Sequence, residues 1–241
     1  MNSFYWQLIS QISLGIGLVL LLVAVIIAIR FRVISNLVSE LTSKGVTAEK
    51  GLQTPSVSMS MRASDEFFAG DNSDDNKDGD IITVDVGACY KGYHGDSGWT
   101  YTVGNVTDPK VLKLLEVTEK ALYIGLEQVK PGNHVGDVSN AIQTYVESFG
   151  FGLPADYTGH GIGRSVHEDP YVPNVGKPGT MALLKKGMCI AVEPMVFMGS
   201  PKCYTLPDGW GVKSYDHSWA AHYEHTVAIT DDGYRILTKE D

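Results

Sequence analysis

The chain contains 241 residues, of which 44% are hydrophobic, and its formal net charge is -9 at pH 7. Proteins that bind nucleic acid normally present a basic surface, so this acidic balance excludes nucleic acid as an expected partner. The three cysteines, Cys89, Cys189 and Cys203, show no metal-type spacing. We therefore expect free thiols in a reducing compartment.

The first element along the chain is an apolar segment. Residues 1–29 carry no charged side chain, and residues 14–29 are apolar apart from two glycines, with Ile12 extending the stretch. A run of ~18 to 20 apolar residues can cross the hydrocarbon core of a membrane as a helix. The pattern predicts one transmembrane helix and membrane attachment through residues 12–29.

The flank of this segment predicts its orientation. Arg30 and Arg32 follow the apolar stretch and favour the cytoplasmic side. No basic residue precedes the stretch, which argues against a cleavable signal peptide. We expect a transmembrane segment with its basic flank at residues 1–32 and the remainder of the chain in the cytoplasm. The alternative is a core helix of a cytoplasmic protein.

Three later segments are predicted to be helical. Residues 109–129 carry apolar side chains along one face and end at Pro131-Gly132, and residues 137–149 end at Gly150. Residues 35–43 show the same spacing over a shorter length. Residues 35–43 and residues 137–149 share a Ser-Asn pair near their start, which suggests a pseudo-symmetric fold. Two chance pairs explain this weak repeat nearly as well.

Two acids lie near predicted strands that are close in sequence. Asp85 belongs to the β-branched run Ile81–Val86, and Asp96 stands just before the run Trp99–Val103. Gly92 lies in the connection. This pattern predicts a β-hairpin that carries both carboxylates.

Three further residues complete a set with metal-binding chemistry. His160 is surrounded by glycines that allow close backbone approach to a site, Glu193 ends an apolar run, and Glu224 begins another. Acids at the edges of buried strands are costly unless something neutralises them. Four carboxylates and one imidazole are suited to a pair of divalent first-row metal ions.

A second acidic pattern competes for Asp85. Residues 74–79, together with Asp85, match the ligand spacing of an EF-hand calcium loop. Such a loop must lead into a helix, whereas residues 81–84 are strongly β-branched. An acidic turn before a strand is therefore the preferred interpretation.

The segments around these acids resemble the type I methionine aminopeptidases, which are pita-bread metallopeptidases. The resemblance covers residues 34–241 and is most specific at residues 159–174, 193–195 and 224–226. It implies an α+β, pseudo-symmetric pita-bread fold for a metallopeptidase domain at residues 33–241. It also implies removal of the N-terminal Met from nascent polypeptides.

The resemblance implies two divalent metal ions as cofactors. Cobalt, manganese, iron and zinc all accept carboxylate and imidazole ligands, so the identity of the metal stays open. Five residues match the family's metal ligands: Asp85, Asp96, His160, Glu193 and Glu224.

The resemblance also assigns roles to individual residues. Asp96 and Glu224 match the ligands that bridge the two ions, and Glu193 matches the residue that carries the proton of the attacking water. His167 matches the residue that hydrogen-bonds the substrate carbonyl. Two residues match positions that line the methionine pocket: Val166 and Trp210.

Three positions depart from the family pattern. Ala69 replaces a His that touches substrate, Ser58 replaces a Cys, and His222 replaces a Gln, which is a mild change. The first departure leaves a second hypothesis open, a catalytically weak, metal-binding relative that acts as a membrane-tethered protein for N-termini. A proline-specific or dipeptide-cleaving relative on the same fold is less favoured.

Overall fold

The computed structural model describes the backbone of residues 57–60 and the complete residues 78–207 and 212–239. The chain divides into two units, Met1–Gly51 and Leu52–Asp241, and every described residue belongs to the second. Within the described ranges, no helix is long and apolar enough to cross a membrane.

Several predictions fall outside the described residues. They concern the membrane segment at residues 12–29, the domain boundary after residue 32, and the helix at residues 35–43. Ala69 and Trp210 also lie outside. These statements therefore stay predictions.

The predicted hairpin is confirmed. Strands β2 (Ile81–Tyr90) and β3 (Tyr93–Thr102) pair antiparallel, and β1 (Val57–Ser60) adds a third strand on the outer side of β2. Lys91 and Gly92 form the two-residue turn with φ angles of 51° and 76°. Positive φ at both positions matches the right-handed twist of the strands. Strand β2 begins at Ile81, just after the acidic stretch of residues 74–79. The expectation that a strand, and not the helix of an EF-hand, follows this stretch is therefore confirmed.

The first helix of the described part is α2 (Pro109–Leu126), close to the predicted range. Asp108 caps its N-terminus by accepting a hydrogen bond from the backbone N–H of Lys110 at 2.8 Å. Proline at the first helical position suits this start because its missing N–H would have had no helical partner. The buried face of α2 includes Leu114 and Leu122.

Helix α3 (Val135–Glu147) begins two residues before the predicted range and is followed by Gly150 with a φ of 74°. The early start comes from its cap. The backbone N–H of His134 donates to Asp137 Oδ2 at 2.7 Å, which satisfies a group that the helix leaves unpaired. The sequence gives no usual signal for this start, because position 134 holds His and not Ser, Thr, Asp or Asn.

The main sheet has five strands in the order β12-β11-β6-β4-β5, and every neighbouring pair is antiparallel. Two smaller two-stranded sheets pair β7 with β10 and β8 with β9. The bounds are β4 Thr158–Gly161, β5 Glu168–Pro173, β6 Cys189–Val192, β7 Met195–Phe197, β8 Cys203–Thr205, β9 Val212–Ser214, β10 Ala220–His222, β11 His225–Ile229 and β12 Tyr234–Ile236.

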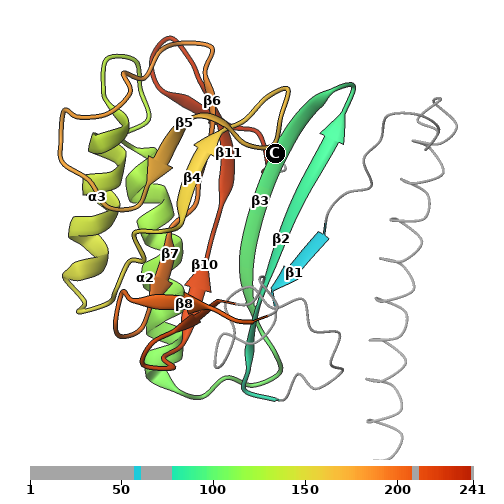
Figure 1. The fold of residues 1–241 in the computed structure, drawn as a ribbon, viewed down its shortest axis with the longest axis vertical. Helices are drawn as coiled ribbons and strands as arrows, with labels where there is room; N and C mark the ends of the chain where they lie inside the picture. Colours follow the sequence, from blue (N-terminus) through green and yellow to red (C-terminus); the bar gives the residue numbers. More distant parts are fainter. Residues whose placement is uncertain (1–56, 61–77, 208–211, 240–241) are drawn as a thin grey trace, which may run out of the picture. The chain divides into compact units, whose positions relative to one another are not determined.

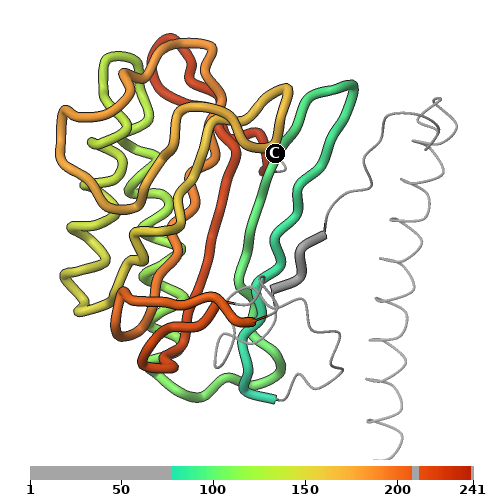
Figure 2. Tube along the Cα trace, in the orientation of Figure 1, coloured from blue at the N-terminus to red at the C-terminus, as the bar shows by residue number. Residues whose placement is uncertain are grey.

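The helices and the hairpin lie on opposite sides of the central strands. Figure 1 shows α2 and α3 beside β4, β6 and β11, with β3 running along the other side of β11. The Cα trace in Figure 2 shows the same arrangement, with β3 and the red C-terminal segment side by side. The buried core joins both helices to the main sheet through side chains such as Leu122, Ile142, Ile190 and Val227. The expected α+β class is confirmed, and the three cysteines are free thiols, as expected.

Candidate metal centre

Asp85 and Asp96 lie on one face of the β2–β3 hairpin. The register pairs Asp85 with Gly98 and Gly87 with Asp96. Paired residues point to the same face and side chains alternate along each strand, so the two carboxylates are diagonal neighbours, each opposite a glycine. Burial, followed by the charge of Asp96, raises the pKa of Asp85 to about 7. Asp96 lies inside β3, which begins six residues before the predicted strand Trp99–Val103.

His160 and Glu193 reach the same place from the main sheet. His160 is in β4 and pairs with Ala191 of β6, and Glu193 follows the last residue of β6. His160 Nε2 lies 3.4 Å from Glu193 Oε1 and 3.8 Å from Asp96 Oδ2. The main sheet and the hairpin thus contribute to one cluster.

The glycines beside His160 lie against the backbone of neighbouring strands. A Cβ on Gly159 would strike the carbonyl oxygen of Ala191, and one on Gly161 would strike the carbonyl oxygen of Asp169. The close approach that they permit is between neighbouring strands of the sheet. The expected close approach of the backbone to the site stays a prediction for these two residues.

The hydrogen bonding of His160 determines which nitrogen faces the carboxylates. Its Nδ1 lies 2.9 Å from the carbonyl oxygen of Gly161. A carbonyl can only accept, so Nδ1 carries the proton in the neutral ring and Nε2 keeps its lone pair. Desolvation by burial lowers the pKa of His160 and favours this neutral form. A neutral imidazole held in this way is the usual form of a histidine metal ligand.

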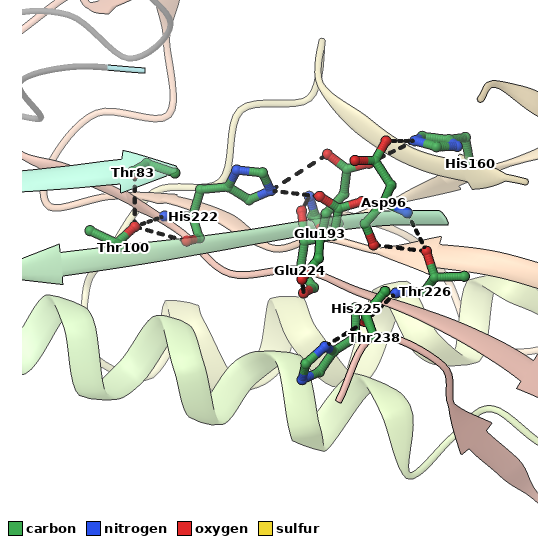
Figure 3. A network of polar contacts seen from close by, with 12 residues as sticks. Thr83, Asp96, Thr100, His160, Glu193, His222, Glu224, His225, Thr226 and Thr238 are labelled. Atoms are coloured by element: carbon green, nitrogen blue, oxygen red, sulfur yellow. Dashed lines mark hydrogen bonds and ion pairs between the residues drawn. The ribbon is translucent and has the colours of Figure 1, made fainter. Parts of the chain in front are cut away.

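Glu224 is positioned by hydrogen bonds between β3 and the segment that leads into β11. Its backbone N–H donates to the carbonyl oxygen of Gly98 at 2.8 Å. Thr226 Oγ1 accepts from the backbone N–H of Asp96 at 2.9 Å and donates to its carbonyl oxygen at 2.8 Å. Figure 3 shows Glu224 beside Asp96 and Glu193 as a result.

The resulting cluster is too acidic to be fully ionised by itself. Burial raises the pKa of Glu193 and of Glu224 well above the ordinary value, and the neighbouring carboxylates raise both further. Within the described residues, Glu224 Oε1 is buried and accepts no hydrogen bond. Asp96, His160 and Glu224 each place one ligand atom within 4.8 Å of the others. Divalent cations would neutralise these charges, so the donor set fits them.

Two residues of the site were not identified from the sequence. The side-chain nitrogen of Asn174 donates to the carbonyl oxygen of Glu193 at 3.0 Å. His222 is fully buried, and its Nε2 lies 3.7 Å from Glu193 Oε2 and 3.9 Å from Glu224 Oε2. Burial lowers the pKa of His222 to about 4, which keeps the ring neutral at ordinary pH. The only signal in the sequence is the replacement of the family's Gln by His222, a change that by residue type alone looks mild.

The residues expected to contact substrate lie at the edge of the cluster. His167 is exposed, and its ring centroid is 4.3 Å from that of His160. Val166 is half-buried beside it. The third expected residue, Trp210, is outside the described residues.

Residues 32–231 match the metallopeptidase family M24. The chain belongs to this family, and its metal-type donor set agrees with that membership. The chain is similar to methionine aminopeptidase 1 of Bacillus subtilis (strain 168), with 53% identity over 163 residues, which are 68% of this chain and 65% of the relative. It is also similar to methionine aminopeptidase of Clostridium perfringens, with 44% identity over 200 residues, 82% of this chain and 80% of the relative.

A solved structure supports the fold. The crystal structure of methionine aminopeptidase from Thermotoga maritima aligns with a TM-score of 0.71 and 45% identity, covering 77% of this chain and 74% of that one. The expected pita-bread fold is therefore confirmed. The alignment to the Bacillus relative spans just under two thirds of that protein's length, at 65%.

Proposed function

We propose that this chain is a methionine aminopeptidase that removes the N-terminal Met from nascent polypeptides or peptides with the help of two divalent metal ions. The observation that carries the proposal is the convergence of four carboxylates and His160 from the hairpin, the main sheet and the segment before β11. The relatives at 53% and 44% identity are methionine aminopeptidases, which supports the same activity.

The proposed ligand set follows from the cluster. Asp85, Asp96, His160, Glu193 and Glu224 would hold the two ions between them. When bound, two divalent cations lower the pKa of a water molecule toward neutrality and polarise the substrate carbonyl. Cobalt, manganese, iron and zinc all suit these donors.

The chain's own residues would carry the proton. A Glu193 carboxylate oxygen takes a proton from the attacking water and passes it to the leaving amine. Glu193 suits this role because Asn174 holds its backbone and because His160 Nε2 lies 3.4 Å from Oε1.

His167 would act on the substrate carbonyl. Its exposed ring stands against His160, so a peptide that enters from solvent meets His167 before it meets the buried carboxylates. A hydrogen bond from His167 to the carbonyl oxygen would strengthen as negative charge develops there. Val166 and Trp210 are the proposed lining of the methionine pocket.

Substrate turnover tests this function. After chelation and reloading with cobalt or manganese, we expect the protein to release Met from Met-Ala-Ser, and Glu193→Gln to abolish the release. Cleavage of Ala-Pro in place of Met-Ala-Ser would identify a proline-specific enzyme instead. A folded, metal-loaded protein that cleaves neither peptide would contradict the enzymatic proposal. That result would favour the catalytically weak, N-terminus-binding relative suggested by Ala69.

We also propose, from the sequence alone, that residues 12–29 anchor the chain in a membrane and that residues 33–241 form a metallopeptidase domain on the cytoplasmic side. The support is the uncharged stretch of residues 1–29 followed by Arg30 and Arg32. The full chain should remain in the membrane pellet after carbonate extraction, and a chain shortened to residues 33–241 should stay in solution and bind metal. Loss of folding on this truncation would identify a core helix and the cytoplasmic alternative.

A further inference from the structure

Glu193 stands between two imidazole rings. Its Oε1 faces Nε2 of His160 at 3.4 Å, and its Oε2 faces Nε2 of His222 at 3.7 Å. Figure 3 shows the two rings on either side of the carboxylate cluster. Each ring also faces a second acid, since His160 Nε2 is 3.8 Å from Asp96 Oδ2 and His222 Nε2 is 3.9 Å from Glu224 Oε2.

The four separations have a common property. All of them, 3.4 to 3.9 Å, exceed the length of an ordinary hydrogen bond between nitrogen and oxygen. Two ligands that each bind one cation at about 2.1 Å lie about 3.0 to 4.2 Å apart, depending on the angle between them. The distances from His222 Nε2 to its two carboxylates are thus similar to those from His160 Nε2 to its two carboxylates. Both sets of distances fit donor atoms that bind one cation.

The backbone opposite His222 leaves room for this placement. A Cβ on Gly98 would lie 2.9 Å from Cε1 and 3.2 Å from Nδ1 of His222. The same Cβ would lie 3.3 Å from Cβ of Glu224, so a larger residue at this position of β3 would force the His222 ring to shift from its present position. The backbone of His222 is held by the side chain of Thr100. Thr100 Oγ1 accepts a hydrogen bond from the N–H of His222 at 2.9 Å and donates one to its carbonyl oxygen at 2.8 Å.

We propose that His222 is a sixth ligand of the metal centre and that its Nε2 binds a cation from the side of the carboxylate cluster opposite His160. The centre would then hold two imidazoles and four carboxylates. This inference rests on the metal site proposed above and extends it to a residue outside the five ligands that the sequence resemblance implies.

X-ray absorption of the cobalt-loaded full chain tests the inference, because imidazole ligands give a distinctive outer-shell scattering. We expect two imidazoles per protein in the wild type and one in His222→Gln, together with an affinity for cobalt lowered at least about tenfold in calorimetry. His217→Asn, at an exposed histidine away from the cluster, is the matched control and should leave both readings unchanged.

The outcomes separate the two proposals. A wild type that binds cobalt through a single imidazole would overturn the role of His222 and leave the five-residue site standing. A protein that binds no divalent metal would overturn both. Two imidazoles in both wild type and His222→Gln would assign the second ring to another histidine and overturn the inference.

Two further variants cover the case in which His222→Gln does not fold. His167→Gln should keep two imidazoles, because His167 is exposed and stands beside His160. A count that drops to one in His167→Gln would contradict the role of His222. Gly98→Ala should lower the imidazole count or the cobalt affinity by displacing the His222 ring, and an unchanged centre in that variant would also contradict it.

Discussion

Thr226 holds Asp96 by both of its backbone polar groups, although the two residues are 130 positions apart. The hydroxyl accepts from the N–H at 2.9 Å and donates to the carbonyl at 2.8 Å, so a single side chain fixes β3 against β11 at the candidate metal centre. The position of a proposed metal-binding carboxylate therefore depends on a residue that binds no metal in this proposal.

Replacement of Thr226 by Val should distinguish the contribution of its two hydrogen bonds to Asp96 from the contribution of its packing. The change keeps the shape of the side chain but leaves a buried N–H and a buried carbonyl without a partner, and we expect a loss of about 2–4 kcal/mol in the free energy of unfolding. Metal affinity should fall as well, because Asp96 is no longer held. Thr226→Ser, which keeps the hydroxyl, is the control. Equal stability of Thr226→Val and the wild type in urea unfolding would contradict this account.

Removal of metal should make stability depend on pH. Without cations, the pKa of Asp85 is raised from 3.8 to about 7, and those of Glu193 and Glu224 are also raised. The folded state then binds more protons than the unfolded state, so stability is fully present below the ordinary pKa and is lost as the pH rises through about 7. We expect the melting temperature of the chelated protein to fall between pH 6.5 and pH 8, because below the ordinary histidine pKa of 6.5 the lowered pKa values of His160 and His222 make stability change in the opposite direction.

Two control experiments test whether the buried carboxylates cause this pH dependence. Manganese or cobalt at neutral pH should restore the melting temperature, because a bound cation favours the ionised carboxylates. Asp85→Asn should reduce the fall in the chelated protein because it removes one of the buried charges. A melting temperature of the chelated protein that is constant or rises over this range would show that the acids are not packed as described.

His167→Ala should lower kcat more than it raises KM for Met-Ala-Ser. A hydrogen bond that strengthens in the transition state contributes about 10²- to 10³-fold in rate. Metal content should be unchanged, since His167 is exposed beside His160. A rise in KM with kcat unchanged would place the contact of His167 in ground-state binding.

Ala69→His should raise kcat if Ala69 occupies the position of the family's substrate-contacting histidine. The restored donor would stabilise charge on the reacting peptide, while the affinity for metal should stay nearly the same. The relevant comparison is between the variant and the wild type, both folded and both loaded with the same metal. Absence of any gain would favour the N-terminus-binding function or another position for that histidine.

Local patterns in the sequence were sufficient for the hairpin that carries Asp85 and Asp96 and for the first helix. The β-branched run that holds Asp85 predicts β2, Gly92 predicts the turn, and apolar spacing predicts α2, because each signal lies within a few neighbouring residues. Helix α3 starts two residues before its predicted range because His134 is not a usual capping residue and gives no signal of the start. The choice of candidate ligands came from residue types and the family resemblance, and their role as ligands stays a prediction.

The sequence by itself determined the chemical types available, four acids and one histidine, and it predicted the hairpin that carries Asp85 and Asp96. Only the tertiary structure decided which of these residues meet. Asp96 comes beside Glu224 through hydrogen bonds between β3 and the segment before β11. His222 reaches Glu193 because Gly98, more than a hundred positions earlier, has no side chain. Distances of this kind depend on packing between distant segments, and neither propensity nor spacing along the chain encodes them.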